Sequence, residues 1–458
     1  MAIADWTTRL KRLEVGEKLV RRNPFYYSPV RHELERLEDA DLQTRLEWTR
    51  MRLDRMLCAA RRTSYGRVVG APRALSEWPL LTKDAVRDHP EAFCRLAWGG
   101  QWFNAVATTG GTTGVPLRLI RSPESVVAEQ ACQDLALERS GIDPRRARLA
   151  VLRADDVKNP NEHEPPYWIF ALGGRRLIFS SNHLSERTLL DFVRALRDFA
   201  PDVLWVYPTP LEVLCLLLQQ VGLRLDVRCV LSSSEVLQPQ VWQLARDVLG
   251  CTLIDRYGQA ERVACAHAFA PGAYRFVPGY SHVELVEAVR EQDHVLYEIV
   301  GTSLWNGVMP LVRYRTGDLI RLPASYGERE LTEVACGMRS FEGVIGRTNE
   351  VLLAPCGTSV LTGINHLPRG VGRLLRLQVA QESPDRVVLR VLAAPGFSLD
   401  DEAQLLKNAR AKIPEPIEVR VEVRTELERT AGGKTPYVVH GPEVKEKLRA
   451  IGFAAAAR

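Results

Sequence analysis

Short apolar runs alternate with amphipathic stretches through the middle of the chain. The apolar runs have the length of buried strands and cover residues 149–152, 203–207, 227–231 and 251–254. The amphipathic stretches have helical spacing and cover residues 123–140, 187–199, 211–220 and 239–249. Strands and helices that alternate at these lengths are typical of a parallel sheet covered on both faces. The pattern therefore predicts an α/β fold.

The chain changes in character on either side of this region. Residues 1–75 are largely charged, rich in leucine and arginine and helical in period, whereas residues 274–322 alternate as strands do. The last part of the chain predicts a compact α+β unit, with strands at 374–379, 386–392 and 417–423 and a helix at 400–412. We therefore expect a large domain over residues 1–347, made of an N-terminal helical region, parallel sheet and β subdomain, and a small domain over residues 348–458.

A loop rich in glycine and threonine lies between two short apolar segments. Residues 107–116 read Ala-Thr-Thr-Gly-Gly-Thr-Thr-Gly-Val-Pro. Glycines allow backbone amides to approach an anion closely, and threonine hydroxyls can donate further hydrogen bonds to phosphate oxygens. The loop is not a Walker motif, because Val115 stands where that motif requires lysine. Taken alone, such a turn is also typical of an ordinary surface loop.

Composition narrows the class of protein further. The 458 residues are 46% apolar and 26% charged, which is ordinary for a soluble globular protein. The net charge of +5 is spread along the chain, so the sequence does not predict a nucleic-acid partner. Residues 1–13 lack the apolar core expected of a signal peptide. No run of eighteen apolar residues occurs in the sequence, so no membrane span is expected. The nine cysteines lack a paired spacing and predict reduced thiols in a cytoplasmic protein.

Four more polar motifs follow predicted strands, where an open α/β sheet binds its ligands. They are Ser-Ser-Ser-Glu at 232–235, Asp-Arg-Tyr-Gly-Gln-Ala-Glu at 255–261, Arg-Tyr-Arg-Thr-Gly-Asp at 313–318 and Gly-Arg-Thr-Asn-Glu at 346–350. A fifth motif, Arg-Thr-Ala-Gly-Gly-Lys at 429–434, lies near the C-terminus. In order and spacing, together with the glycine/threonine loop, these motifs resemble the adenylate-forming superfamily of acyl-CoA synthetases, luciferases and carrier-protein adenylation domains. The phenylacetate–CoA ligase-like branch fits best.

The resemblance implies an ATP- and Mg²⁺-dependent ligase with a mobile small domain. Such an enzyme joins a small carboxylic acid to ATP, releases pyrophosphate and transfers the acyl group to a thiol, with coenzyme A as the favoured acceptor. A carrier-protein thiol or an amine is the alternative acceptor. A nucleotide-binding protein without catalysis is the alternative from another class.

The resemblance assigns the β- and γ-phosphates of ATP to the glycine/threonine loop, with Thr112 as a catalytic residue. The loop residues concerned are Thr108, Thr109, Gly110, Gly111, Thr112, Thr113 and Gly114. Gly110 stands where the family has a serine, which removes one hydroxyl but keeps the turn. Lys434 is expected to bridge the carboxylate and the α-phosphate, although an isolated lysine in a glycine turn is often only solvated. Asn349 stands at the hinge, where the family commonly has aspartate or lysine.

Further nucleotide contacts are implied by the motifs at 232–235 and 255–261. Glu261 would hold Mg²⁺, which prefers carboxylate oxygen, although a solvated helix-cap carboxylate is the ordinary alternative. Tyr257 would stack on adenine and Gly258 would allow close approach. The remaining implied contacts are Ser234, Glu235, Asp255 and Gln259, and the serine-rich turn could equally be a helix N-cap.

Asp318 would accept hydrogen bonds from the ribose hydroxyls, with Arg315 and Arg347 near the phosphate or ribose. Either arginine could instead form a surface ion pair. The acid pocket is expected to include Tyr207, Ser233 and Trp168. The aromatic rings of Tyr207 and Trp168 favour an aryl or cyclic acid, although each of the three could be a core residue.

Relatives in this branch often carry a structural zinc ion, and they are often homodimers, which the sequence itself does not fix. The matching regions offer Cys265, His267, His282 and Cys336. At most one family ligand is retained among them, and tetrahedral zinc needs four. The sequence therefore favours packed thiols over a zinc site.

Overall fold

The computed structural model describes residues 19–95, 104–108, 117–153, 157–158, 162, 164–290, 292–347, 352–353, 360–361, 364, 367–368, 371, 373–410, 413–429 and 435–450. The chain forms two compact units. The first holds the residues up to 343, except 110–116 and 317–321. The second holds those two segments and residues 344–458.

An eight-stranded sheet is the centre of the first unit, in the order β10-β9-β8-β7-β6-β3-β5-β4. Its strands are β3 (Leu149–Arg153), β4 (Trp168–Ala171), β5 (Arg176–Ser180), β6 (Val203–Val206), β7 (Cys229–Ser233), β8 (Thr252–Gly258), β9 (Cys265–Ala268) and β10 (Tyr274–Phe276). The neighbours among β5, β3, β6, β7 and β8 are parallel, whereas β4, β9 and β10 are antiparallel to their neighbours. This sheet confirms the predicted α/β class.

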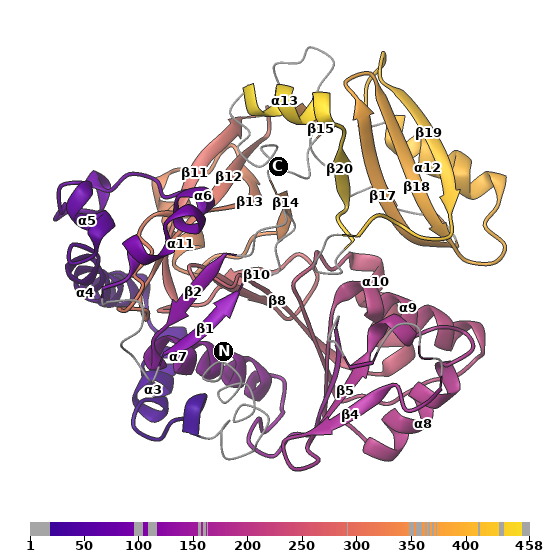
Figure 1. Ribbon diagram of the computed structural model, residues 1–458, viewed down its shortest axis with the longest axis horizontal. Coiled ribbons are helices and arrows are strands. Elements are labelled where there is room, and N and C mark those ends of the chain that lie inside the picture. The colour runs from indigo at the N-terminus through magenta and orange to yellow at the C-terminus, as the bar shows by residue number, and fades with distance from the viewer. Residues whose placement is uncertain are drawn as a thin grey trace. The chain divides into compact units, whose positions relative to one another are not determined.

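Helices cover both faces of this sheet, as the alternating pattern predicted. The crossover helices are α8 (Leu189–Phe199), α9 (Pro208–Gln220) and α10 (Pro239–Leu249), and α9 contacts both of the others (Figure 1). On the other face, α7 (Pro123–Arg139) packs Ala136 and Leu137 against Val203 and Leu231 of the strands. The start of α7 is fixed by Ser122, whose Oγ accepts a hydrogen bond from the Ser125 amide at 3.2 Å.

The N-terminal helices pack on the rest of the first unit through aromatic side chains. These helices are α3 (Tyr27–Glu38), α4 (Leu42–Ala60) and α5 (Ser64–Val68), followed by the short α6 (Lys83–Asp88). Trp48 of α4 lies 5.8 Å from Trp305, centroid to centroid. Tyr27 of α3 donates a 2.5 Å hydrogen bond to the buried Asp134 of α7. The predicted helical region is therefore anchored by tertiary packing.

The remaining strands of the first unit form a ribbon and a second sheet. The ribbon pairs β1 (Ala105–Thr108) with β2 (Arg118–Arg121) on either side of the glycine/threonine loop. The second sheet pairs β11 (Ser281–Arg290) with β12 (His294–Ser303), and β13 (Tyr314–Pro323) begins beside β12, where Thr316 Oγ1 donates to the Ile299 carbonyl at 2.7 Å. Helix α11 (Glu328–Ala335) follows.

The second unit has its own sheet and core. Its strands are β14 (Val344–Arg347), β15 (Leu352–Leu353), β16 (Val360–Leu361), β17 (Leu374–Ser383), β18 (Arg386–Ala393), β19 (Glu418–Arg424) and β20 (Val438–His440). The last four form a sheet in the order β19-β18-β17-β20, accompanied by α12 (Leu399–Arg410) and α13 (Pro442–Ala450) (Figure 1). Leu405 and Ala409 of α12 pack on Leu377, Val379 and Leu389 of the strands, so this part of the chain is α+β.

Two motifs lie inside strands rather than at the turns the sequence predicted. Strand β8 continues to Gly258, because Asp255 and Arg256 pair with β7 on one side and with β9 on the other. Similarly, β13 already includes Arg315 and Asp318. Within the described residues, no helix is long and apolar enough to span a bilayer.

Candidate functional site

The carboxyl ends of four parallel strands meet at one edge of the large sheet. Leu152 of β3 pairs with Val206 of β6, Val206 with Ser232 of β7, and Ser232 with Asp255 of β8. Tyr207, which directly follows this row, therefore lies at the same edge as Ser233. Ligands of open α/β sheets bind outside the carboxyl ends of the strands. The register thus brings together several of the predicted site residues.

Ser233 and Tyr207 lie among aromatic side chains at this edge. Ser233 is buried and its Oγ accepts a 3.1 Å hydrogen bond from Trp205 Nε1. The next residue, Ser234, has φ +75°, a conformation that non-glycine residues adopt rarely and mostly at functional turns. The N-cap of the following helix α10 is Gln238, so the serine-rich turn is not that helix's N-cap.

The guanidinium of Arg153 is a feature of this edge that the sequence reasoning missed. Its Cζ lies 4.1 Å from the Trp205 ring centroid and 5.9 Å from that of Tyr207. A cation above two aromatic faces is attracted by their quadrupoles. The sequence could have indicated this role, because Arg153 directly follows the predicted apolar strand 149–152.

Trp168 lies apart from this group. It is on the edge strand β4, and the sheet order places β5 and β3 between β4 and β6. At about 4.8 Å per strand, Trp168 is separated from the β6 position by roughly 14 Å. Its ring contacts Phe179 instead, at 5.8 Å between centroids.

Residues 257–261 form the second part of the candidate site. Tyr257 is half-buried and its hydroxyl accepts a 3.1 Å hydrogen bond from Gln259 Nε2. Gln259 Oε1 accepts in turn from the Ala264 amide at 3.2 Å. A Cβ on Gly258 would lie 3.4 Å from a guanidinium nitrogen of Arg256. A side chain at this position would therefore contact the Arg256 guanidinium.

Glu261 is a buried carboxylate in the turn between β8 and β9. Its residue is 8% exposed, and its Oε1 accepts a 2.8 Å hydrogen bond from the Tyr314 hydroxyl. Glu261 is therefore not a solvated carboxylate at a helix cap, which was the ordinary alternative for this residue. The tyrosine fixes the orientation of the carboxylate, as a metal ligand requires.

Three arginines surround Glu129 of α7 and support this turn. Arg256 and Tyr280 both donate to the Glu129 carboxylate, and Arg262 Nε lies 3.6 Å from its Oε2. The third arginine, Arg121, donates a 2.6 Å hydrogen bond to the carbonyl of Ala260, the residue before Glu261. Burial alone would raise the pKa of Glu129, but the neighbouring arginines and the Tyr280 hydroxyl hold the pKa at about 2. Burial lowers the pKa of Arg121 to about 10.

Glu129→Gln is expected to destabilise the protein near pH 7 by about 3 kcal/mol, because the arginines lose their counter-charge. The pKa of Glu129 is about 2 in the folded protein against 4.5 ordinarily, so its contribution is complete above about pH 4.5. It is lost as the pH falls from there toward 2. Urea unfolding of wild type and variant at pH 7 and pH 4 measures this, and the difference should shrink at pH 4.

Glu138→Gln is the matched control on the same helix. Glu138 pairs with Arg31 at 2.6 Å on the surface, and loss of an exposed pair costs below about 1 kcal/mol. If the two variants are equally destabilised at pH 7, the arginine cluster does not depend on Glu129.

Asp255 lies on β8 near the sheet edge that carries the candidate site, and its side chain is buried in the core. It is 3% exposed and its Oδ2 accepts a hydrogen bond from the Tyr274 hydroxyl. Burial raises the pKa of Asp255 to about 6, although the bond from Tyr274 limits the rise. The predicted contact of Asp255 with a nucleotide stays a prediction.

Asp255→Asn is expected to alter how stability depends on pH. Because the folded pKa of about 6 lies above the ordinary 3.8, the unfolded chain ionises first as the pH rises. Wild type should therefore lose up to about 3 kcal/mol relative to the variant between pH 4 and pH 6.5. Urea midpoints of both proteins across this range measure the difference, and parallel curves would contradict the buried, partly neutral carboxyl.

The ribose-side residues lie on β13. Arg315 Nε forms a 2.9 Å ion pair with the buried carboxylate of Glu298. This is the ion pair considered as the alternative role of Arg315, and it neutralises part of the guanidinium charge. Asp318 is buried, 5% exposed, and is the ladder partner of Arg347 in the second unit. The pairing brings the Asp318 and Arg347 backbones together.

Several predicted site residues lie outside the described residues. They are Thr109, Gly110, Gly111, Thr112, Thr113, Gly114, Asn349 and Lys434. Thr108 and Arg347 are described through their strands only. Their roles remain expectations from the family resemblance.

The cysteines and histidines near β9 show no metal cluster. Cys265 Sγ lies 3.8 Å from His267 Nε2, and burial lowers the pKa of His267 to about 3. Across the described ranges, no three side chains of His, Cys, Asp or Glu are grouped as metal ligands.

Comparisons with known proteins show what the chain is similar to. It is 25% identical over 257 residues to phenylacetate-coenzyme A ligase of Pseudomonas putida, covering 54% of this chain and 51% of that protein. It is 20% identical over 292 residues to the protein CapK of Staphylococcus aureus, and the match covers 61% of this chain and 60% of that protein. The chain thus matches about half to three-fifths of the length of these curated relatives. No protein-family model matches it.

A solved structure has the same fold. The crystal structure of 2-hydroxyisobutyryl-CoA ligase with an acyl-AMP compound in the postadenylation state superposes with a TM-score of 0.58 at 14% identity. The match covers 88% of this chain and 91% of that one. The structural match confirms the predicted fold, and the sequence similarity to phenylacetate-coenzyme A ligase agrees with the family resemblance predicted from the motifs.

Proposed function

We propose that this chain, which is similar in sequence and fold to the adenylate-forming enzymes, activates a carboxylic acid with ATP and transfers the acyl group to a thiol. The favoured acceptor is coenzyme A, which makes the protein an AMP-forming acid–thiol ligase. One observation carries the proposal: the buried, tyrosine-oriented Glu261 lies three residues after Gly258, in the turn that follows β8 at the edge of the large sheet. The similarity to the Pseudomonas putida ligase supports it.

The chemistry requires that negative charge be stabilised along the triphosphate while a carboxylate attacks the α-phosphate. Glu261 would hold Mg²⁺, a hard cation that would neutralise phosphate charge at this position. The carboxylate fits this role because it is buried and oriented by Tyr314. Loop residues including Thr112 would donate hydrogen bonds to the β- and γ-phosphates.

The substrate acid is proposed to lie at the carboxyl ends of β6 and β7. Tyr207 and Ser233 are at this edge, and the rings of Trp205 and Tyr207 lie beside the Arg153 guanidinium. Flat apolar walls with one cation suit an aryl or cyclic acid, whose ring would stack while its carboxylate is attracted to the charge. Trp168, on β4, is the member of the predicted pocket that this placement leaves out.

The two half-reactions would use different arrangements of the second unit. Lys434 would approach the carboxylate and α-phosphate during adenylation, and rotation at Asn349 would follow before thioester formation. Asparagine tolerates unusual backbone angles, so it suits a hinge. A cytoplasmic location is also proposed, because the eight described cysteines are all free thiols.

A discharge experiment identifies the acceptor. The enzyme is loaded with ATP, Mg²⁺ and a responsive acid, and the bound acyl-AMP is then exposed to coenzyme A, hydroxylamine or a phosphopantetheine-bearing carrier protein. Rapid release of AMP with coenzyme A supports the proposal. Release only with the carrier or the amine would replace coenzyme A by that acceptor. Failure to accumulate acyl-AMP with any acid would favour a non-catalytic nucleotide-binding protein.

A further inference from the structure

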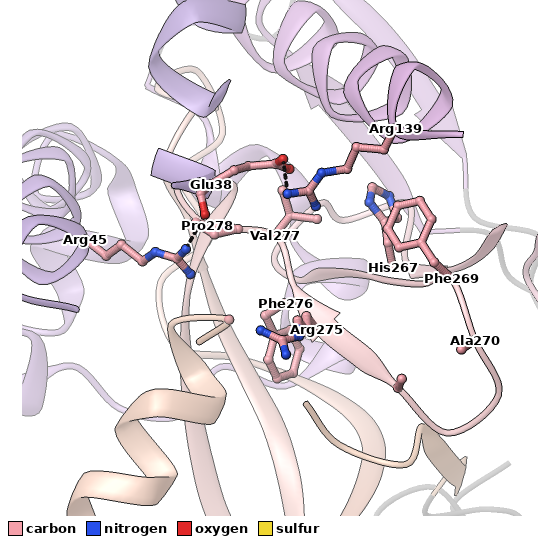
Figure 2. A pocket seen from close by; sticks show the side chains of 12 residues that line it. Glu38, Arg45, Arg139, His267, Phe269, Ala270, Arg275, Phe276, Val277 and Pro278 are labelled. Carbon is pink, nitrogen blue, oxygen red and sulfur yellow. Dashed lines mark hydrogen bonds and ion pairs between the residues drawn. The ribbon is translucent and has the colours of Figure 1, made fainter. Parts of the chain in front are cut away.

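A cavity of about 390 Å³ lies in the first unit beside β9 and β10, at one end of the strand order of the large sheet, and its lining includes no residue of the candidate site. Figure 2 shows side chains from several elements converging on it. Arg45 comes from α4, Arg139 from the end of α7, and Arg275 from β10. Phe269, Phe276 and Pro278 are among the apolar lining residues. None of these side chains has a role in the proposed reaction.

The cavity carries an excess of positive charge. Its lining holds three guanidiniums and a single carboxylate, that of Glu38. His267 adds no charge at neutral pH, because burial lowers its pKa to about 3. The lining therefore has a net charge of about +2, and such a concave, mainly positive surface attracts anions.

Among the residues that the structure describes, neither Arg45 nor Arg275 forms an ion pair with a carboxylate within 4 Å. Arg45 is 6% exposed and donates to the carbonyls of Glu38, Ala40 and Cys336, at 2.6, 3.0 and 3.0 Å. Arg275 donates to the Met338 carbonyl at 2.8 Å. Carbonyl oxygens satisfy N–H groups without cancelling the charge. Each guanidinium has five N–H groups, so both retain donors for a ligand.

Arg139 combines charge with an aromatic surface. Its Nη2 pairs with Glu38 at 2.7 Å, and its Cζ lies 6.0 Å from the Phe269 ring centroid. Phe269 is 41% exposed, which is high for so large an apolar side chain. Figure 2 shows Arg139, Phe269 and His267 on one side of the cavity and Arg45 on the other. A ligand here would meet cations and a flat apolar wall together.

We propose that this cavity binds the phosphate group of a small molecule. A phosphate near pH 7 carries a charge of about −1.5 to −2, close to that needed to neutralise the lining. Planar guanidiniums bind its oxygens in bidentate fashion. The volume suits a small ligand, and the Phe269 wall suits the organic part of a phosphomonoester. The ligand is thus either inorganic phosphate or a phosphomonoester, and the site is separate from the one that would bind ATP.

Calorimetric titration of the full chain with phenyl phosphate and, separately, inorganic phosphate tests the proposal. We expect one site, weakened at least tenfold in Arg275→Ala and in Arg139→Ala. Tighter binding of phenyl phosphate identifies a phosphomonoester as the better ligand, whereas equal binding identifies free phosphate. Arg275→Ala is the more secure variant, because its one described hydrogen bond is to a carbonyl at the surface. Thermal melts verify that both variants fold.

Two control variants separate this cavity from other anion sites. Arg146 is on the surface with a side chain 90% exposed, so Arg146→Ala changes the net charge equally without touching the cavity. Lys434→Ala alters the proposed catalytic machinery. Both should bind phosphate as wild type does. The proposal is overturned if no binding is detected, if Arg146→Ala weakens binding as much as Arg275→Ala, or if only Lys434→Ala weakens it.

Discussion

Lys434→Ala is expected to slow acyl-adenylate formation on the order of 1,000-fold, while transfer from a supplied acyl-AMP to coenzyme A stays within about threefold of wild type. Charge develops between the attacking carboxylate and the α-phosphate only in the first half-reaction, and one donor aimed at such charge contributes about 10²–10³ in rate. The second half-reaction has no triphosphate to neutralise. Pyrophosphate release measures the first step, and AMP release from purified acyl-AMP with coenzyme A measures the second.

Lys447→Ala is the matched control for this prediction. Lys447 lies on α13 in the same unit, and its ammonium pairs with Glu443 at 2.8 Å on the surface. Its removal should leave both half-reactions unchanged. Equal loss of the two half-reactions in Lys434→Ala would show that the lysine supports the fold or both steps, and would contradict the assigned role.

Glu261→Gln is expected to reduce pyrophosphate release on the order of 100-fold, because a charged oxygen that would hold Mg²⁺ is replaced by a neutral amide. Part of the loss should be recovered at high Mg²⁺ concentration, since the remaining phosphate ligands still bind the cation. The measurement is the initial rate as a function of Mg²⁺ at saturating ATP. A rise in the Mg²⁺ concentration needed for half-maximal rate separates a metal-binding role from a loss of folding.

Two further variants refine the Glu261 prediction. Tyr314→Phe removes the hydroxyl that donates to Glu261 Oε1 at 2.8 Å, and should cost about tenfold through misorientation of the carboxylate. Glu328→Gln, on the exposed first turn of α11, removes the same charge from the surface and should cost nothing. A Glu261→Gln enzyme with wild-type Mg²⁺ dependence would exclude the proposed metal ligand.

The alternation of apolar and amphipathic segments was sufficient to predict the parallel part of the fold. The predicted runs 203–207 and 227–231 correspond to β6 and β7, which are largely buried, so their apolar composition identified them as strands. Strand β4 was harder to predict, because it lies at the sheet edge, where Ile169 and Phe170 are exposed. Trp168 of this strand was predicted to line the acid pocket, and that assignment stays a prediction.

The motifs located the candidate site, but its supporting contacts could not be predicted from them. Glu129 is 127 residues from Arg256 in sequence and reaches it only because α7 lies over the sheet. Likewise, Tyr314 reaches Glu261 across 53 residues. Residues this far apart in the sequence leave no local pattern that identifies them as partners. From the sequence alone, Arg121, Arg256 and Arg262 cannot be distinguished from surface arginines.

Acid-dependent exchange of labelled pyrophosphate into ATP is the most direct measurement of the central proposal. Wild-type protein is incubated with ATP, Mg²⁺, labelled pyrophosphate and a panel of aryl, cyclic, alkyl and amino acids, without any acceptor. We predict exchange that depends on an aryl or cyclic acid and that falls on the order of 100-fold in Glu261→Gln. Exchange that is absent with every acid, while a direct titration shows that ATP binds, would contradict adenylation and indicate a nucleotide-binding protein without catalysis.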